Sequence, residues 1–345
     1  MKVIAIAAVT AGGKTTVVNK LIKKLPHAKS LHFDDYSFVG EVEDFNAWVK
    51  NGADYNIWDL SPLKTDILAI KESGECEYLI LDYPFAYCNV GMSELKERKY
   101  MVAVLTSSLG GSHKVNGNRV PTNLLNENGL TDKLKQYWKE GSRVLIISAG
   151  PDAFERNDNI LYCQTEAFEM SGLKAESFEM CDSRTMQLAE NIKSYDVIVL
   201  AGGHVPTQNN FFKKIDLKNN LKDFDGLIIA WSAGSMNCAE VVYAQPELEG
   251  EAIDPKFQRF IPGLGITKQM IIPHFQNVKT DILDGYRVME DMAFPDSRGR
   301  EFVALNDGSF IISENGSETL YGEAYLIKDG TLSQMCRDGE SIQLV

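Results

Sequence analysis

The feature that most constrains this chain is a series of short apolar runs of strand length, separated by segments whose apolar residues have helical spacing. Runs of Val, Ile and Leu with few polar residues are typical of parallel strands that helices cover on both faces. Helices are predicted at Lys14–Leu25 and Leu130–Glu140. Strands are predicted at Val3–Ala8, Ser30–Phe33, Tyr78–Asp82, Met101–Thr106, Arg143–Ser148, Asp196–Ala201, Leu227–Trp231 and Gln269–Ile272. The pattern predicts an α/β fold with parallel sheets up to about Phe302.

After Phe302 the pattern changes to short strands separated by turn sequences. These turns are Asn306-Asp307-Gly308, Asn315-Gly316 and Lys328-Asp329-Gly330. Asn-Gly and Asp-Gly pairs favour the tight turns that join antiparallel strands. Terminal β-hairpins are therefore expected.

The length of 345 residues predicts two domains, at roughly 100–200 residues per domain. The charged segment Ser93–Tyr100 is the best boundary, because a new buried-strand pattern begins at Met101. We therefore expect two unrelated α/β units, one over residues 1–98 and the other over residues 101–345.

Composition and charge exclude several classes of partner. The formal net charge is −13, and most of the excess negative charge lies after residue 100. An acidic surface repels phosphate backbones, so no nucleic acid partner is expected. No apolar run reaches the roughly 20 residues of a membrane span, so no membrane partner is expected either. The first apolar run leads straight into a glycine loop, and we interpret it as a strand rather than a signal peptide.

Six cysteines lack Cys-x-x-Cys spacing and five histidines are scattered, so neither a zinc site nor a disulfide framework is indicated. This cysteine usage fits a reducing, cytoplasmic location. The pattern leaves the oligomeric state open, and a homo-oligomer is compatible with it.

A glycine loop, Gly12-Gly13-Lys14-Thr15, lies between the first predicted strand and the first predicted helix. Small residues let backbone N–H groups surround phosphate oxygens at a helix N-terminus. Lys14 supplies a positive charge to the phosphates, and the Thr15 hydroxyl can ligate Mg²⁺. A P-loop NTPase-like unit that binds ATP or GTP with magnesium is predicted.

The next two strands end in acidic residues, Asp34-Asp35 and Asp82. Together with the glycine loop, residues 1–95 resemble the uridine kinase-like P-loop proteins. The resemblance implies that Asp35, or Asp34, is the base for an acceptor hydroxyl and that Asp82 lies near the magnesium. The alternative is that Asp34 and Asp35 only cap the segment that follows them.

The unit is nevertheless too short for such a kinase. The remaining strands and the arginine-bearing lid are missing, since Arg98 is the only arginine before Arg119. Phosphoryl transfer depends on positioning and charge neutralisation. We expect a truncated module that binds nucleotide at best and has no kinase activity.

In the second unit, the strand Leu227–Trp231 ends at Ser232-Ala233-Gly234. A serine on a sharp turn between a strand and a helix exposes its Oγ as a nucleophile. The simpler interpretation is a serine that caps the helix. The surrounding sequence favours the nucleophile.

Two other predicted strands end in groups that a serine nucleophile needs. One continues into Gly202-Gly203-His204, where the N–H of Gly203 can join that of Ala233 in an oxyanion hole. Another leads to Pro273-His274, which supplies the base. The residues alone leave the acid open among Glu240, Glu247, Glu249 and Glu251, with Glu240 weaker because it lies about two helical turns beyond the serine.

Trp231-Ser232-Ala233-Gly234, the Gly-Gly turn and Ile272-Pro273-His274-Phe275 resemble peptidase E, the aspartyl dipeptidase family of serine peptidases, over residues 101–345. Cyanophycinase belongs to the same superfamily. The resemblance implies a class I glutamine-amidotransferase-like fold and a Ser–His–acid triad. Its acid lies fifteen residues after the serine, at Glu247. His204 and Ala230 replace the usual Asn and Gly, and Glu replaces the usual Asp.

The expected function is therefore that of a serine peptidase of the dipeptidase E type. It would hydrolyse short peptides, with Asp-X dipeptides as candidate substrates. Ser232, His274 and Glu247 form the expected triad, with Gly203 and Ala233 as oxyanion hole and no metal or cofactor. The cation that an acidic substrate needs is not identified by the sequence. One alternative is a nucleotide-binding regulatory protein with an inactive or divergent peptidase-like domain. Another is residual nucleoside kinase-like activity in the first unit.

Overall fold

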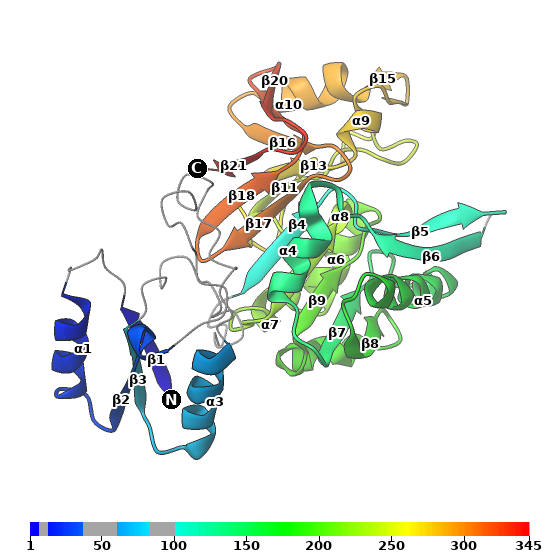
Figure 1. Ribbon diagram of the computed structural model, residues 1–345. Helices are drawn as coiled ribbons and strands as arrows, with labels where there is room; N and C mark the ends of the chain where they lie inside the picture. The colour runs from blue at the N-terminus through cyan, green and yellow to red at the C-terminus, as the bar shows by residue number, and fades with distance from the viewer. Residues whose placement is uncertain (7–12, 37–60, 83–100, 117, 345) are drawn as a thin grey trace. The chain divides into compact units, whose positions relative to one another are not determined.

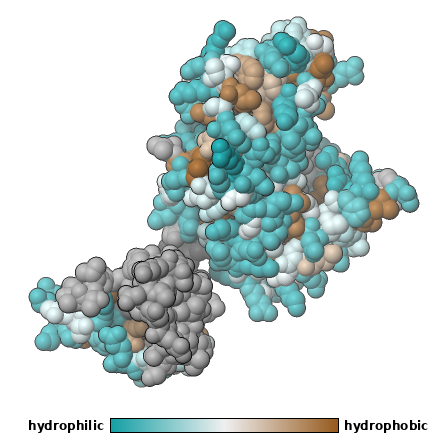
Figure 2. Space-filling view, turned by 45° about the horizontal axis from the view of Figure 1, so that its top comes forward, coloured by the Kyte–Doolittle hydropathy of each residue, from teal (hydrophilic) through white to brown (hydrophobic). Residues whose placement is uncertain are grey.

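The computed structural model describes residues 1–6, 13–36, 61–82, 101–116 and 118–344. The chain divides into two compact units, Met1–Glu97 and Arg98–Val345. Apolar side chains form the buried core of each unit, and the surface visible in Figure 2 is mostly hydrophilic with scattered apolar patches.

The first unit contains a three-stranded parallel sheet in the order β1-β3-β2, with helices α1 and α3 flanking it (Figure 1). Its elements are β1 (Lys2–Ile6), α1 (Lys14–Ile22), β2 (Ala28–His32), the 3₁₀ turn η1 (Phe33–Asp35), α3 (Ser61–Ser73) and β3 (Tyr78–Asp82). The central strand β3 pairs with both neighbours, and its Leu79 and Leu81 pack against Leu63 and Ile67 of α3. The continuous apolar run Tyr-Leu-Ile-Leu thus marks the buried central strand, as expected.

The second unit is built on an eight-stranded sheet in the order β21-β18-β17-β4-β10-β9-β7-β8. Strands β4, β10, β9, β7 and β8 are parallel, whereas β17, β18 and β21 pair antiparallel beside β4 (Figure 1). The strands are β4 (Val102–Thr106), β7 (Ser142–Ile147), β8 (Ala175–Cys181), β9 (Val197–Leu200), β10 (Leu227–Trp231), β17 (Phe310–Glu314), β18 (Ser317–Tyr321) and β21 (Ser341–Leu344). This is the mixed α/β fold with a parallel-rich sheet that the apolar runs predict. The more specific amidotransferase-like assignment stays a prediction.

Two separate hydrophobic cores cover the two faces of this sheet. Val102 and Val104 point to the core that contains α4 and α5, while Ala103 and Leu105 point to the opposite core. Side chains alternate between the faces of a strand, so a strand covered on both faces must be apolar at every position. The covering elements are α4 (Leu130–Tyr137) and α5 (Phe154–Met170) on one face, and η5 (Met186–Ser194), α6 (Val205–Lys214) and α7 (Leu217–Asn220) on the other.

A second sheet, in the order β13-β16-β19-β20, has its own aromatic core around Tyr243 and Phe302. Its strands are β13 (Met270–Ile272), β16 (Glu301–Leu305), β19 (Ala324–Lys328) and β20 (Thr331–Cys336). The hairpin turns expected at residues 315–316 and 328–330 are confirmed by the antiparallel pairs β17·β18 and β19·β20. The hairpin expected at residues 306–308 is wrong, because β16 and β17 belong to different sheets.

The other elements are short and surround these sheets. They are β5 (Gly110–Val115) with β6 (Asn118–Leu124), η4 (Glu127–Gly129), α8 (Ala233–Asn237), β11 (Val241–Tyr243) with β12 (Phe260–Pro262), α9 (Phe275–Val278), β14 (Ile282–Leu283) with β15 (Tyr286–Arg287), η6 (Val288–Ala293) and α10 (Phe294–Asp296).

Five strands lead, at their carboxyl ends, into segments that contain residues of the candidate active site. Strand β4 leads to Ser107, β9 to Gly202-Gly203, β10 to Ser232, β13 to His274 and β16 to Asp307. Ligands of open α/β sheets bind in crevices outside the carboxyl ends of the strands.

Candidate active site

Ser232 lies on a strained turn between β10 and α8. Its backbone angles are φ 53° and ψ −120°, outside the regions that L-residues ordinarily occupy. Its side chain makes no capping hydrogen bond to the helix, so the interpretation as a simple helix cap is not supported. Strain of this kind is typical of functional sites, and here it belongs to a residue with a nucleophilic side chain.

Glycines allow the neighbouring backbone to approach this turn closely. A Cβ atom on Gly234 would lie 2.3 Å from the carbonyl oxygen of Leu200, so α8 could not pack as closely against β9. A Cβ atom on Gly202 would lie 2.5 Å from Nε1 of Trp231 and 3.1 Å from Cβ of Ser232. The Gly-Gly turn therefore lies directly beside the serine.

The two backbone N–H groups expected to form an oxyanion hole, those of Gly203 and Ala233, have no hydrogen-bond partner within the part of the chain that the structure describes. Both are close to the serine turn, since Gly203 follows Gly202 and Ala233 is the first residue of α8. They are thus available as donors. The function of these donors stays a prediction.

His274 follows β13 and has a left-handed backbone, with φ 54°. Its Nδ1 is 2.7 Å from Oδ1 of Asp307. Its backbone N–H donates to Oγ of Ser107 at 2.7 Å. Asp307 therefore holds the imidazole at Nδ1 while Ser107 holds the backbone of His274, and Nε2 of the ring is left for a proton-transfer partner.

Asp307 is the centre of this arrangement, and sequence reasoning missed it. Besides His274, its carboxylate accepts hydrogen bonds from Ser107 Oγ at 2.8 Å and from Gln276 Nε2 at 2.6 Å. Burial raises the pKa of Asp307, but the interactions with His274, Ser107 and Gln276 outweigh it and hold that pKa below its usual value. Asp307 is therefore a carboxylate under ordinary conditions.

Ser107 connects this group to the nucleophile turn. Its backbone carbonyl, with that of Thr106, accepts from the N–H of Ser232 at 3.2 and 3.1 Å, respectively. The same residue donates its hydroxyl to Asp307. One residue after β4 thus touches both the serine turn and the acid.

Glu247, the acid expected from the family spacing, is not the hydrogen-bond partner of His274. Asp307 takes the place at Nδ1 because the β16–β17 connection reaches the carboxyl end of β13, whereas Glu247 lines the same pocket without a hydrogen bond to the imidazole. Partial desolvation and the nearby charge of Glu251 raise the pKa of Glu247 to about 7, against a smaller opposing effect of His274. Of the other acidic candidates, Glu251 contacts His204 Nε2 at 2.8 Å.

A pocket of about 290 Å³ contains Ser232, His274 and Glu247 together. Its wall is largely apolar and comes from the segments around α8, β13, α9 and η6; the remaining lining residues are Met236, Gln245, Pro246, Ile272, Pro273, Val278, Asp281, Ile282, Leu283 and Val288. A concave, mostly apolar pocket with a few polar groups is typical of sites for small ligands.

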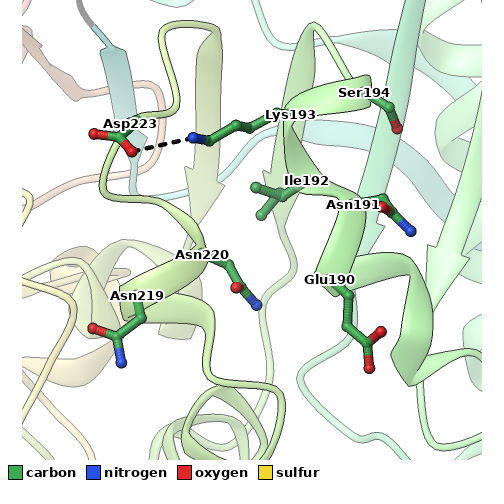
Figure 3. A pocket seen from close by; sticks show the side chains of 8 residues that line it. All are labelled: Glu190, Asn191, Ile192, Lys193, Ser194, Asn219, Asn220 and Asp223. Atoms are coloured by element: carbon green, nitrogen blue, oxygen red, sulfur yellow. Dashed lines mark hydrogen bonds and ion pairs between the residues drawn. The ribbon is translucent and has the colours of Figure 1, made fainter.

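A second pocket, of about 360 Å³, lies between η5, α7 and the segment before β10. Figure 3 shows Lys193 reaching Asp223 across it, at 3.1 Å between Nζ and Oδ2. Both segments precede strands, so this pocket lies at the amino ends of β9 and β10, away from the serine. None of the predicted site residues lines it.

The first unit brings two of its predicted residues together. The Thr15 hydroxyl donates to Asp82 Oδ2 at 2.7 Å, and His32 Nδ1 lies 3.3 Å from the same oxygen. Asp35 is exposed in the turn η1, and Gly13 and Lys14 begin α1. Gly12 lies outside the described residues.

No cluster of three or more His, Cys, Asp or Glu that could hold a metal ion occurs among the described residues. Within the same ranges, no helix has the length and apolar character needed to cross a membrane. Cys76, Cys163, Cys181, Cys238 and Cys336 are free and buried, and Cys88 is outside the described residues.

Comparison with known proteins gives a family match. The model of Peptidase family S51 matches residues 126–321, more than half of the chain. Among curated proteins no match was found. Similar solved structures include a peptidase from an acI-B1 Actinobacterium, with 17% identity and a TM-score of 0.47, covering 73% of this chain and 100% of that chain. A putative peptidase E protein from Listeria monocytogenes EGD-e has 14% identity and a TM-score of 0.40, covering 68% and 98%.

Proposed function

The chain belongs to peptidase family S51, and from this we propose that it hydrolyses short peptides with Ser232 as nucleophile, His274 as base and Asp307 as orienting acid. The observation that carries the proposal is the 2.7 Å contact between His274 and Asp307 in the pocket that also contains the strained Ser232. Nucleophile, base and orienting group are the three parts of a serine hydrolase.

In this mechanism Oγ of Ser232 attacks the peptide carbonyl carbon while Nε2 of His274 takes its proton. The N–H groups of Gly203 and Ala233 stabilise the negative charge on the carbonyl oxygen. His274 then gives the proton to the leaving amine, and an acyl-enzyme remains. Water, deprotonated by His274, attacks the acyl group and releases the acid product and free Ser232.

Asp307 supports this cycle by accepting from the protonated Nδ1, which leaves Nε2 as the basic nitrogen. The hydrogen bonds from Ser107 and Gln276 keep its carboxylate ionised and correctly oriented. Glu247 has no such contact with the imidazole and is left free for another role in the same pocket.

The test uses the purified full chain, a mixture of dipeptides and tripeptides, and the variant Ser232→Ala. We expect the wild type to release free amino acids and the variant to lose activity by at least about 10³-fold. An organophosphorus serine reagent should label the wild type at Ser232 and fail to label the variant. Peptide hydrolysis that survives Ser232→Ala would contradict the assignment.

Nucleotide binding by the first unit is a second proposed function, favoured by the contact between Thr15 and Asp82. Asp82 is 5% exposed, and its Oδ1 has no hydrogen-bond partner in the described part of the chain. A buried carboxylate oxygen without a donor fits a cation, and the oxygen ligands that Mg²⁺ prefers are those of Thr15 and Asp82. These residues would hold the ion, and Lys14 at the start of α1 would face the phosphates.

Binding of ATP and GTP in the presence of magnesium tests this second function. We expect Lys14→Ala to weaken binding by at least about tenfold, because it removes a charge from the phosphate site. Lys20→Ala, further along the same helix, is the matched control. Equal binding by the wild type and Lys14→Ala would show that the loop has no nucleotide site.

A further inference from the structure

The polar side chains that line the Ser232 pocket away from the catalytic pair are two carboxylates and one amide. They belong to Gln245, Glu247 and Asp281. Among the residues that the structure describes, no Lys or Arg lines this pocket, and His274 is already held by Asp307. The pocket therefore presents negative charge and acceptor oxygens, without a cation that could neutralise an acidic ligand.

Gln245 shows that an acceptor in this pocket lacks its donor. The residue is 7% exposed, and its Oε1 has no hydrogen-bond partner among the described residues. A buried acceptor without a donor destabilises the folded chain. A buried polar group without a partner requires an explanation, and a ligand that supplies the missing donor provides one.

The two carboxylates are also unpaired. Glu247 and Asp281 are exposed residues, and neither side chain makes a hydrogen bond or ion pair with a described residue. Elsewhere in the same region the acidic groups are satisfied, since Asp284 accepts from the N–H groups of Gly250 and Ala252 at 2.9–3.0 Å. The contrast separates the acids that shape the loop from those that face the pocket.

The loop that carries Glu247 is fixed in place. Glu251 accepts from the backbone N–H groups of Glu247 and Leu248 at 2.9 and 3.0 Å. The same carboxylate contacts His204, next to the Gly-Gly turn, at 2.8 Å. The backbone of Glu247 is therefore fixed relative to the Gly-Gly turn beside Ser232 before any ligand binds.

We propose that this pocket binds the positively charged group, an ammonium or a guanidinium, of the residue whose carbonyl Ser232 attacks. Glu247, Asp281 and Gln245 receive its N–H groups. Met236, Ile272 and Val288, which are 1–3% exposed, pack against its aliphatic part. The cation is either a Lys or Arg side chain or the free α-amino group, since both carry the same donors. This inference rests on the proposed peptidase function, and its side-chain form replaces Asp-X as the expected substrate.

The electrostatics of Glu247 agree with a missing cation. Its pKa is raised to about 7, because desolvation by surrounding atoms and Glu251 disfavour the charged form, although the residue keeps an exposed surface that weakens the effect. An ammonium or guanidinium in the pocket would act in the opposite direction and favour the carboxylate. The positive charge of the ligand and the carboxylate of Glu247 would thus compensate each other.

The test measures binding to the full chain carrying Ser232→Ala, so that no turnover is required. Four amides separate the two sources of charge: lysinamide, norleucinamide, Nα-acetyl-lysinamide and Nα-acetyl-norleucinamide, with aspartic acid α-amide as the acidic competitor. Nα-acetyl-norleucinamide has no cation and is the reference. We expect the amides that carry the recognised cation, either the α-amino group or the side-chain ammonium, to bind at least about tenfold more tightly than this reference. Norleucinamide identifies the α-amino group, and Nα-acetyl-lysinamide identifies the side chain.

Glu247→Gln and Asp281→Asn are each expected to remove most of this difference, and Glu249→Gln, outside the pocket lining on the same loop, is expected to leave it intact. Thermal melting checks that each variant is folded. Equal binding of all four amides, tighter binding of the aspartic amide, or a preference unchanged by both pocket variants would overturn the cation pocket. The peptidase function fails on a different result: peptide hydrolysis independent of Ser232, or no labelling of that serine.

Discussion

At the scale of single residues, the sequence predicts the positions of Ser232 and His274 but not their partner. Both follow buried strands, and a local pattern suffices for that. Asp307 lies in an Asn-Asp-Gly turn that favours a hairpin, and its role depends on β16 and β17 joining different sheets. Long-range packing determines which sheet each strand joins, and a short sequence motif does not predict it. The family spacing indicated Glu247, and that residue does line the same pocket.

The distinction between the two acids can be measured. We expect Asp307→Asn to lower kcat by about 10³–10⁴-fold with a smaller change in KM, because the imidazole loses the acceptor that fixes its tautomer. Reaction of Ser232 with the organophosphorus reagent should slow in parallel, and Asp307→Glu should restore part of kcat.

Glu247→Gln is the comparison for Asp307→Asn. On a peptide without a positive charge it should change kcat by less than about tenfold, since Glu247 does not contact the imidazole. A larger loss for Glu247→Gln than for Asp307→Asn would restore Glu247 as the triad acid.

At the scale of elements, the strand predictions are confirmed where both faces of the strand are buried. The runs at β3, β4, β7, β9 and β10 are apolar at nearly every position because helices cover both faces of those strands. Strand β8 was not predicted, because it lies at the edge of the sheet and its sequence Ala-Glu-Ser-Phe-Glu-Met-Cys includes exposed polar residues. An edge strand with one open side lacks the signal on which the prediction depends.

Helix α8 owes its position to one glycine, and this gives a prediction at the same scale. Gly234→Ala places a Cβ atom 2.3 Å from the backbone oxygen of Leu200, so α8 must move away from β9. We expect a loss of about 1–3 kcal/mol in the free energy of unfolding, and reduced labelling of Ser232 in the remaining folded protein. Denaturant unfolding measures the first and mass spectrometry the second.

Gly150→Ala is the matched control for this substitution. Its added Cβ atom would meet only Cβ of Ala153, at an ordinary distance of 3.5 Å. Equal stability of Gly234→Ala and the wild type would show that the close approach of α8 and β9 is not required.

At the scale of the whole molecule, the chain combines a larger unit that carries a complete candidate site with a smaller unit whose described sheet has three strands. The boundary expected between residues 98 and 101 rests on a charged segment, which lies outside the described residues. The two proposed sites use different chemistry, a phosphate and magnesium site in one unit and a serine nucleophile in the other. Ligands can therefore address each unit separately.

Calorimetry of the full chain tests whether each site stabilises its own unit. A ligand that binds only the folded state adds about 2.7 kcal/mol at one hundred times its dissociation constant. We expect ATP with magnesium to raise one unfolding transition and lysinamide to raise another. Lys14→Ala should abolish only the first shift, because Lys14 belongs to α1 of the smaller unit. Glu247→Gln should abolish only the second, because Glu247 lines the pocket of the larger unit. A single transition that both ligands raise would instead show that the two units unfold together, and then the sites would be thermodynamically coupled.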